Sequence, residues 1–495
     1  MTDNRPDAMT LPAAVAGGYQ GTAKLPAYDR SAVTAGIVHL GVGSFHRSHQ
    51  AVYLDRLLAG GAANDWGIRG VGILENDRRM RDILSAQDHL FTVLQKSPDG
   101  TIEARVVGSM VGYQLVEDDP QRAIDMMAAP STRIVTLTIT EGGYNLEPAT
   151  QQFDESNPAV LADLAGEGLP RTHFRLIVEA LKRRRHRNIV PFTVASCDNI
   201  QGNGDMARRT LLRYAELDDP DMAKWIAQNV RFPNSMVDRI TPITAEEDLA
   251  LVATDFGLRD SWPVPCESFT QWVLEDDFSY GRPALEDVGV QFVASVIPYE
   301  LMKLRLLNAS HQLIGAFGFL AGHRYVHQAI TDPLIHKAVT QFQAVEAEPT
   351  LLPVPGIDLQ QYRRTLVERF ANPAIKDTIA RMCLQTSTMI PNFVLPVIRD
   401  QLAAGGAIKR ATATVAAWAC RAEENGDYTI VDRRRHSLVA RAKDLTNPYA
   451  FIEDEELFGD LTHNDRFRSE FRAQRQSIRG QGIHAALAEL VKTAL

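Results

Sequence analysis

A short apolar run, a glycine turn and a helical pattern follow one another between residues 36 and 58. Residues 37–40 form the apolar run, Gly41-Val42-Gly43 ends it, and residues 49–58 place Ala51, Leu54, Leu57 and Leu58 at helical spacing. Glycines at such a point permit a tight turn and let backbone N–H groups approach a phosphate at a helix N-terminus. This order predicts the first strand and helix of a parallel α/β sheet.

The next 150 residues repeat the alternation of strand and helix. Three further runs are rich in β-branched residues, namely residues 68–74, 133–140 and 189–196, and a helical pattern covers residues 172–187. A hairpin is expected as an insertion, because Pro98-Asp99-Gly100 forms a strong turn signal between residues 91–94 and 102–107. The pattern is typical of βαβ units in a Rossmann-like domain.

The sequence changes character after about residue 290, where apolar residues recur every three or four positions. We expect helices over residues 299–320, 359–370, 374–383 and 410–423. The predicted organisation is therefore an N-terminal arm (1–35), a Rossmann-like NAD-binding domain (36–288) and a mainly α-helical substrate and catalytic domain (289–495). The fold class is α/β.

Charge and cysteine content exclude several classes of protein. With 52 Lys and Arg against 61 Asp and Glu, the net charge of -9 repels nucleic acid. The four cysteines form no C-x-x-C pair, which argues against a disulfide framework and favours a reducing cytoplasm. Residues 1–7 carry acidic residues and no positive-then-apolar pattern, and no uncharged apolar run reaches the roughly 18 residues of a membrane span, so we expect neither secretion nor membrane spanning.

The glycine turn is the candidate cofactor site. Gly41, Val42, Gly43, Ser44 and Phe45 match the start of a dinucleotide fingerprint, although His46 stands in place of its third glycine and a simple turn is the alternative. After the second strand, Asp77 favours NAD by accepting ribose hydroxyls, whereas its neighbours Asn76, Arg78 and Arg79 leave NADP open. A plain surface loop is the other interpretation of that cluster.

Three polar residues of the predicted helix 299–320 form the candidate catalytic site. At about 100° per residue, Lys303, His311 and Asn308 lie at roughly 0°, 80° and 140°, along one side of the helix. A buried lysine with a lowered pKa can take a hydroxyl proton, and the amide and imidazole can donate hydrogen bonds to the oxygen. A solvated lysine beside a histidine at the edge of the core is the alternative.

Zinc is the competing chemistry. His46 and His49 are three residues apart, but no cysteine or carboxylate at a recognisable spacing would complete a zinc site. We therefore expect catalysis without a metal ion.

These segments together resemble the polyol-specific long-chain dehydrogenases/reductases. The resemblance runs from about residue 36 into the C-terminal region and rests on residues 41–50 (GVGSFHRSHQ), 138–144 (TITEGGY), 196–199 (SCDN), 233–242 (PNSMVDRITP), 271–276 (QWVLED) and the Lys303, Asn308 and His311 segment. It implies metal-independent hydride transfer between C2 of D-mannitol, or a similar polyol, and NAD, which gives the ketose D-fructose. It also implies a monomer or weak homo-oligomer.

The resemblance assigns roles to seven residues. Lys303 matches the general base, Asn308 and His311 match the pair that stabilises the oxyanion, and Glu141 matches a residue that passes the proton to water. Asn199, Asp238 and Arg381 match residues that bind substrate hydroxyls, a task suited to amide, carboxylate and guanidinium groups. Asp238 and Arg381 have an alternative role as members of buried ion pairs.

One departure bears on the substrate. Met389 stands where the family usually carries a lysine, and losing this cation weighs against a carboxylate-bearing substrate. The remaining alternatives are a D-arabinitol 4-dehydrogenase or hexuronate (fructuronate) reductase activity of the same family, and a nucleotide-binding sensor without catalysis.

Overall fold

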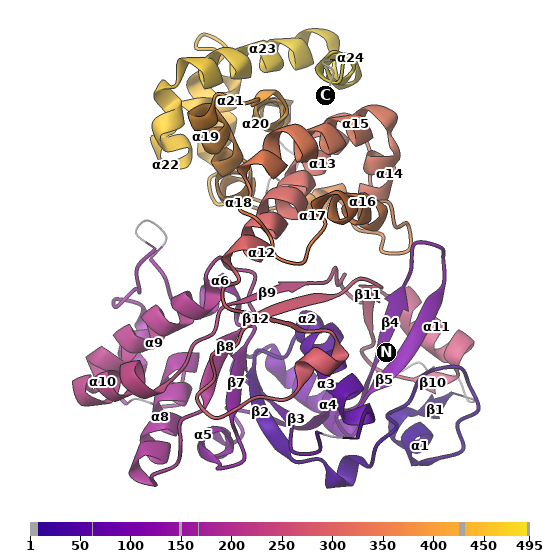
Figure 1. Ribbon diagram of the computed structural model, residues 1–495, viewed down its shortest axis with the longest axis vertical. Helices are drawn as coiled ribbons and strands as arrows, with labels where there is room; N and C mark the ends of the chain where they lie inside the picture. Colours follow the sequence, from indigo (N-terminus) through magenta and orange to yellow (C-terminus); the bar gives the residue numbers. More distant parts are fainter. Residues whose placement is uncertain (1–7, 62, 148–150, 167, 425–430, 493–495) are drawn as a thin grey trace. The chain divides into compact units, whose positions relative to one another are not determined.

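The protein consists of two compact units, Met1–Val296 and Ile297–Leu495. The structure is a computed structural model that describes residues 8–61, 63–147, 151–166, 168–424 and 431–492. The first unit is α/β with a parallel sheet and the second is helical (Figure 1), which confirms the expected fold class. The expected boundary after residue 288 falls just before β13 (Gln291–Val293), a strand of the first unit.

A five-stranded parallel sheet forms the centre of the first unit. Its strand order is β6-β3-β2-β7-β8, with the bounds Ala35–Leu40 (β2), Gly67–Gly72 (β3), Met110–Leu115 (β6), Ile134–Leu137 (β7) and Thr193–Ser196 (β8). The strands β7 and β8 are shorter than predicted. β7 ends early because the chain turns at Thr140, where φ is +60°.

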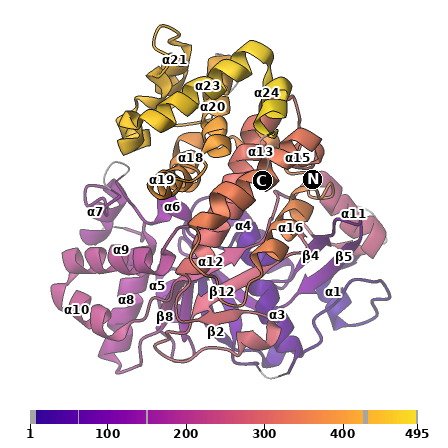
Figure 2. The same ribbon diagram turned by 45° about the horizontal axis from the view of Figure 1, so that its top comes forward.

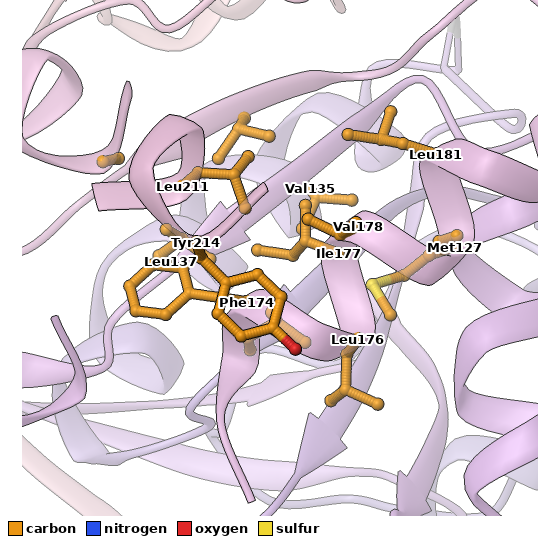
Figure 3. Packing of buried hydrophobic residues seen from close by; sticks show 14 of the residues in the cluster. Met127, Val135, Leu137, Phe174, Leu176, Ile177, Val178, Leu181, Leu211 and Tyr214 are labelled. Carbon is orange, nitrogen blue, oxygen red and sulfur yellow. The ribbon is translucent and has the colours of Figure 1, made fainter. Parts of the chain in front are cut away.

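Side chains of this sheet alternate between two apolar layers. Val38 and Val135 face a cluster that includes residues of α5 (Pro120–Ala128), α8 (His173–His186) and α9 (Asn203–Asp218). Figure 3 shows this layer, in which Met127, Phe174 and Leu211 surround Val135 and Leu137. Ile37 and Ile134 face the opposite cluster, with α3 (Gln50–Ala59) and α4 (Asp77–Ala86). Helices therefore cover both faces, as parallel sheets require.

Smaller sheets flank the central one. The predicted hairpin is confirmed, since β4 (Phe91–Lys96) and β5 (Ile102–Val107) pair antiparallel, and β11 (Val264–Glu267) joins β4 in parallel. β12 (Gln271–Glu275) lies between β13 and β9 (Ser235–Asp238).

The predicted N-terminal arm contains regular structure. β1 (Met9–Thr10) pairs with β10 (Leu258–Arg259), and α1 (Leu11–Ala16) buries Leu11 and Ala14. These elements are too short to show a periodicity in sequence. The other helices of the first unit are η1 (Arg30–Ala32), α2 (Ser44–Ser48), α6 (Thr140–Gly143), α7 (Pro158–Leu164), α10 (Pro220–Asn229), α11 (Glu246–Phe256) and η2 (Leu285–Val288).

The second unit is a stack of helices (Figure 2). The predicted helix 299–320 is divided into α12 (Ile297–Met302), the π-helix η3 (Lys303–Asn308) and α13 (Ala309–Leu320). The helix predicted over residues 374–383 is reduced to α17 (Ile379–Met382), because the chain adopts a positive φ at Lys376.

The remaining helices of the second unit complete the stack. They are α14 (Val326–Thr331), α15 (Pro333–Gln341), the π-helix η4 (Phe342–Ala347), η5 (Glu348–Thr350), α16 (Leu359–Phe370), α18 (Thr386–Phe393), α19 (Leu395–Ala404), α20 (Lys409–Glu424), α21 (Arg435–Lys443), η6 (Ala450–Ile452), α22 (Glu455–Phe458), η7 (Gly459–His463), α23 (Asp465–Gln481) and α24 (Ile483–Leu490). Among the helices described in both units, none is long and apolar enough to cross a membrane.

Two buried histidines, one in β2 and the other in α2, stack on each other. The rings of His39 and His46 are parallel, with their centroids 3.5 Å apart. Burial lowers the pKa of His46 well below its ordinary value, and the neighbouring His39 adds to this effect. Both imidazoles are therefore packed as neutral rings.

Replacing His46 should reduce the sensitivity of the protein to acid. A group whose folded pKa lies below its unfolded value of about 6.5 stabilises the fold fully above that pH, and the contribution is lost as the pH falls. Between pH 7 and pH 5 this loss amounts to about 2 kcal/mol. We expect His46→Phe, which keeps an aromatic ring, to remove this part of the pH dependence of the free energy of unfolding, measured by urea denaturation.

The control for this experiment is His463→Gln, since the His463 side chain is 80% exposed. The effect is assigned to His46 if the pH dependence changes in His46→Phe and not in this control. If the free energy of unfolding of His46→Phe depended on pH as steeply as that of the natural protein, this would contradict the assignment of a neutral, buried His46.

Candidate active site

The two glycines of the turn after β2 have different structural requirements. Gly41 has a φ of +88°, and a Cβ atom there would lie 2.3 Å from the carbonyl oxygen of Thr138. Gly43 is in ordinary extended conformation, and a Cβ atom there would meet only the Gly41 oxygen, at 3.9 Å. Gly41 therefore permits the turn itself, whereas Gly43 leaves open space beside the backbone.

This open space lies at the N-terminus of α2. Ser44 and Phe45 begin the helix, where the first N–H groups have no partner within the helix, and the Val42 side chain is buried in the core. Residues 41–45 thus fit the pyrophosphate of a dinucleotide. His46 replaces the third glycine of the fingerprint, and its stacking on His39 accounts for the close packing of helix and strand there.

Asp77 closes the turn that follows β3. Its Oδ2 atom accepts hydrogen bonds from the N–H groups of Ile73 (2.8 Å) and Leu74 (2.9 Å). The neighbouring arginines have other partners. Arg78 forms a bidentate pair with Glu117, at 2.6 and 2.7 Å, and Arg79 lies over the Trp262 ring, 4.2 Å from its centroid. Both guanidinium groups are thus engaged within the protein.

A buried carboxylate, Asp198, organises the loops after β7 and β8. It accepts hydrogen bonds from the N–H groups of Thr140 (2.8 Å) and Ile139 (3.2 Å) and from the hydroxyl of Tyr144 (2.8 Å). Burial raises the pKa of Asp198, and these hydrogen bonds oppose that effect. The network holds Thr140 at positive φ and fixes the start of α6, where Glu141 is exposed.

The predicted residues of the first unit gather at one edge of the sheet. Residues 41–45, Asp77, Glu141 and the exposed Asn199 all follow the carboxyl ends of β2, β3, β7 and β8. The chain order reverses between β2 and β7, and ligands of such sheets bind at this switch point. Asp238 is buried at the end of β9, in the neighbouring sheet. Ser235 on that strand donates a hydrogen bond to the Ser196 oxygen, at 2.6 Å.

The π-helix η3 aligns the candidate catalytic residues. Its hydrogen bonds join residue i to residue i+5, as the bond from the Ala309 N–H to the Leu304 oxygen shows. Lys303 and Asn308 are therefore about one turn apart, whereas an α-helix would separate them by about 140°. His311 follows Asn308 at the three-residue spacing of neighbours on one α-helical face. The three side chains thus share one face more closely than the sequence predicted.

These side chains are largely shielded from solvent. Lys303 is 6% exposed and Asn308 is 8% exposed, which excludes the solvated-lysine interpretation. Within the described residues, the Asn308 Oδ1 atom is buried without a hydrogen-bond partner. Such an atom normally has a partner, so it is available to a ligand. The His311 ring packs against Phe370, with the centroids 4.8 Å apart.

Sequence reasoning missed Glu300. This buried carboxylate lies three residues before Lys303, a spacing that brings side chains onto the same helical face. The spacing of three residues between this acidic residue and the candidate base could have identified it from the sequence.

Arg381 lies in α17, which packs on α13 beyond His311. The close approach requires Gly315, where a Cβ atom would lie 3.0 Å from the Met382 Cβ. Arg381 is half-exposed and pairs with Asp377, with its Nε 2.6 Å from Oδ1, so it does belong to an ion pair. Met389 is half-buried in α18.

The two histidines weighed as zinc ligands have other contacts. His46 stacks on His39, and the His49 Nε2 atom lies 2.9 Å from the Gln271 carbonyl oxygen. In the part of the chain that the structure describes, no group of three or more His, Cys, Asp or Glu side chains is arranged to hold a metal ion.

Comparison with known proteins gives consistent matches over nearly the whole chain. Residues 35–287 match the mannitol dehydrogenase Rossmann domain and residues 295–479 match the mannitol dehydrogenase C-terminal domain. The chain is 43% identical over 473 residues to mannitol 2-dehydrogenase of Phaeosphaeria nodorum, covering 94% of this chain and 83% of that protein. It is 44% identical over 467 residues to mannitol 2-dehydrogenase of Cereibacter sphaeroides, covering 93% and 97%.

Two solved structures are also similar. The ternary complex of Pseudomonas fluorescens mannitol 2-dehydrogenase with NAD and D-mannitol has a TM-score of 0.87 and 42% identity, covering 96% of this chain and 98% of that chain. A D-sorbitol dehydrogenase in substrate-free form has a TM-score of 0.89 and 34% identity, covering 97% and 100%.

The Asp198 network generates a prediction about stability. In Asp198→Asn the new NH₂ group cannot accept a hydrogen bond, so at least one buried donor among Thr140, Ile139 and Tyr144 loses its partner. We expect the free energy of unfolding to fall by about 1–3 kcal/mol in chemical denaturation. The exposed Asp287→Asn is the matched control and should have no effect. Equal stabilities of the two variants would be inconsistent with this role of Asp198.

Proposed function

The chain belongs to the mannitol dehydrogenase family, and from this membership we propose that it transfers hydride between C2 of D-mannitol and NAD, with D-fructose as the product. It is an oxidoreductase acting on CH–OH groups. The observation that carries the proposal is the alignment of buried Lys303 and Asn308 with His311 on one face of the η3–α13 segment.

Lys303 is the proposed general base. In the oxidative direction its amine accepts the proton of the C2 hydroxyl as the C–H bond breaks. Asn308 and His311 donate hydrogen bonds to the oxygen while negative charge develops on it. NAD, when bound, supplies the hydride acceptor, C4 of the nicotinamide. Base and oxygen stabilisers are all side chains, so we propose that no metal ion takes part.

The other predicted residues have supporting roles. We propose that Glu141 passes the proton released by the reaction to water, since it is exposed on a loop fixed by Asp198. Asn199, Asp238 and Arg381 are the proposed ligands of the substrate hydroxyls. The pairing of Arg381 with Asp377 supports this role, because it holds the guanidinium in a fixed orientation.

NAD is the proposed cofactor in preference to NADP. The turn at residues 41–45 fits its pyrophosphate, and Asp77 supplies negative charge after β3. Arg78 and Arg79, the groups that would favour a 2′-phosphate, are engaged by Glu117 and Trp262. All four cysteines are free, which supports function in a reducing cytoplasm.

A neutral polyol is the proposed substrate class. Met389 carries no charge where a carboxylate-bearing substrate such as a hexuronate would need a cation. D-Sorbitol is the second candidate, favoured by the similarity to the D-sorbitol dehydrogenase.

The glycine turn provides a test of cofactor binding. Gly43→Ala should fold normally, because the Cβ has room, but it should weaken NAD binding by about tenfold or more because the methyl group occupies the space proposed for the pyrophosphate. Gly41→Ala should instead lower the free energy of unfolding by more than about 1 kcal/mol. Thermal unfolding with and without NAD separates the two effects. Unimpaired NAD binding by a folded Gly43→Ala would rule out this site.

The catalytic proposal is tested with Lys303→Ala. We expect kcat for polyol oxidation to fall by about 10²–10⁴, the usual contribution of a general base, while NAD binding persists. The assay measures steady-state oxidation of D-mannitol, D-sorbitol, D-arabinitol, ribitol and xylitol with NAD and NADP, in the presence of EDTA. Lys337→Ala, at an exposed position, is the matched control.

Each alternative gives a different result in this assay. Loss of activity in EDTA would indicate a metal-dependent enzyme. Unchanged turnover in Lys303→Ala would exclude the proposed base, and absence of turnover on every polyol would favour a sugar acid as substrate or a sensor without catalysis.

A further inference from the structure

In the described part of the second unit, two π-helices contact each other. Besides η3, the segment η4 (Phe342–Ala347) has the π pattern, with the Glu348 N–H bonded to the Gln343 oxygen. π-Helices are rare and occur mainly as single turns within α-helices. A π-helical turn therefore needs local contacts that stabilise it relative to a regular α-helix.

Three buried groups meet at a carbonyl inside η3. The Gln343 Nε2 atom of η4 donates to the Leu306 oxygen (3.3 Å) and to the Ser310 Oγ atom (3.0 Å), and Ser310 donates to the same Leu306 oxygen at 2.5 Å. Gln343, Leu306 and Ser310 are all inaccessible to solvent. Two side chains thus bind the backbone oxygen of Leu306, which lies between Lys303 and Asn308 in the chain.

These bonds favour the widened turn over a regular α-helix. A serine that bonds the carbonyl four residues earlier, or a side chain that enters the backbone hydrogen-bond ladder, bends and loosens an α-helix. A π-helix places one more residue between hydrogen-bonded groups than an α-helix does. If η3 became α-helical, this extra residue would be lost, and Lys303 would rotate by about 100° relative to Asn308 and His311. The base would then leave the face that carries the other two groups.

The helix that presents Gln343 is itself anchored. Glu346, one turn further on, accepts hydrogen bonds from the N–H groups of Arg410 and Ala411, both at 2.8 Å, at the start of α20. The Arg410 side chain in turn donates to the Gln341 Oε1 atom, at 2.7 and 3.0 Å. The two backbone bonds to Glu346 therefore hold in place the helix that carries Gln343, and neither of them involves Gln341.

We propose that Gln343, acting with Ser310, is a positioning residue for polyol oxidation: it stabilises the π-helical turn that keeps Lys303 on the same face as Asn308 and His311. The inference rests on the proposed function of those three residues. Gln343 itself acts through the Leu306 oxygen of η3 and through the Ser310 hydroxyl that binds the same oxygen.

The test compares Gln343→Met with Gln341→Met. Methionine has a similar length but no donor, so Gln343→Met removes the bond to Leu306 of η3 and the bond to Ser310 of α13. Gln341→Met instead removes the acceptor of Arg410 in the same region, without touching η3. The readouts are crystal structures of both variants, kcat and KM for the most active polyol of the panel, and the dissociation constant for NAD.

We expect Gln343→Met to rewind η3, so that the Ala309 N–H bonds to the Arg305 oxygen. Its kcat should fall about tenfold to a hundredfold, as for other misplaced catalytic groups, with the NAD dissociation constant unchanged. Gln341→Met should lower the unfolding midpoint and leave kcat as in the natural protein. Ser310→Ala removes the shared hydroxyl with little change of volume and should give a weaker form of the Gln343→Met result, which serves if that variant does not fold.

Retention of the π-helical turn in Gln343→Met and Ser310→Ala would overturn the proposal, as would equal losses of kcat in Gln343→Met and Gln341→Met. The proposed function fails separately, through unchanged turnover in Lys303→Ala. The crystal structures of the variants show whether η3 is π-helical or α-helical, whatever the activity of Lys303→Ala, so the two proposals can fail independently.

Discussion

The carbonyl of Thr138 sets the constraint on which the first unit depends. It approaches the turn after β2 so closely that residue 41 can carry no side chain, and the same turn requires a positive φ. Thr138 also donates from its hydroxyl to the Gly41 oxygen, at 2.7 Å. β2 and β7 are therefore tied together at the switch point of the sheet, where the chain order reverses and a cofactor can enter. Asp198 extends this arrangement by fixing the loop after β7.

In the second unit, the corresponding constraint is the number of residues per turn between Lys303 and Asn308. The π-helical offset brings the proposed base, Lys303, and the two proposed hydrogen-bond donors, Asn308 and His311, onto one face. The turn is internal to a buried helix, and buried polar side chains from η4 and α13 bind its backbone. The arrangement of these three residues thus depends on buried hydrogen bonds from neighbouring helices.

Sequence patterns predicted the strands, the hairpin and most helices because burial imposes a period on them. They failed where the structure depends on the backbone conformation of a single residue or on contacts with distant parts of the chain. The helix predicted over residues 374–383 is shorter because Lys376 takes a positive φ, and α1 and β1 are too short for a period. The candidate residues 303, 308 and 311 could be chosen from their chemistry and the family resemblance. Their alignment could not, because the π-helix depends partly on Gln343, 35 residues after Asn308 in the chain.

The proposed site residues form two groups, one in each unit. Substitutions in the two groups should therefore impair different properties of the protein. The proposed cofactor residues depend on the turn at Gly41 and Gly43 and on loops of the parallel sheet, all within the first unit. The proposed base and its partners depend on helices of the second unit. On this proposal, a substitution that disturbs the glycine turn lowers cofactor affinity and leaves Lys303 in place, and a substitution that disturbs η3 displaces Lys303 and leaves cofactor affinity unchanged. The proposed role of Met389 in substrate choice therefore belongs to the second unit, whereas the glycine turn belongs to the first and is under the separate constraint of Thr138.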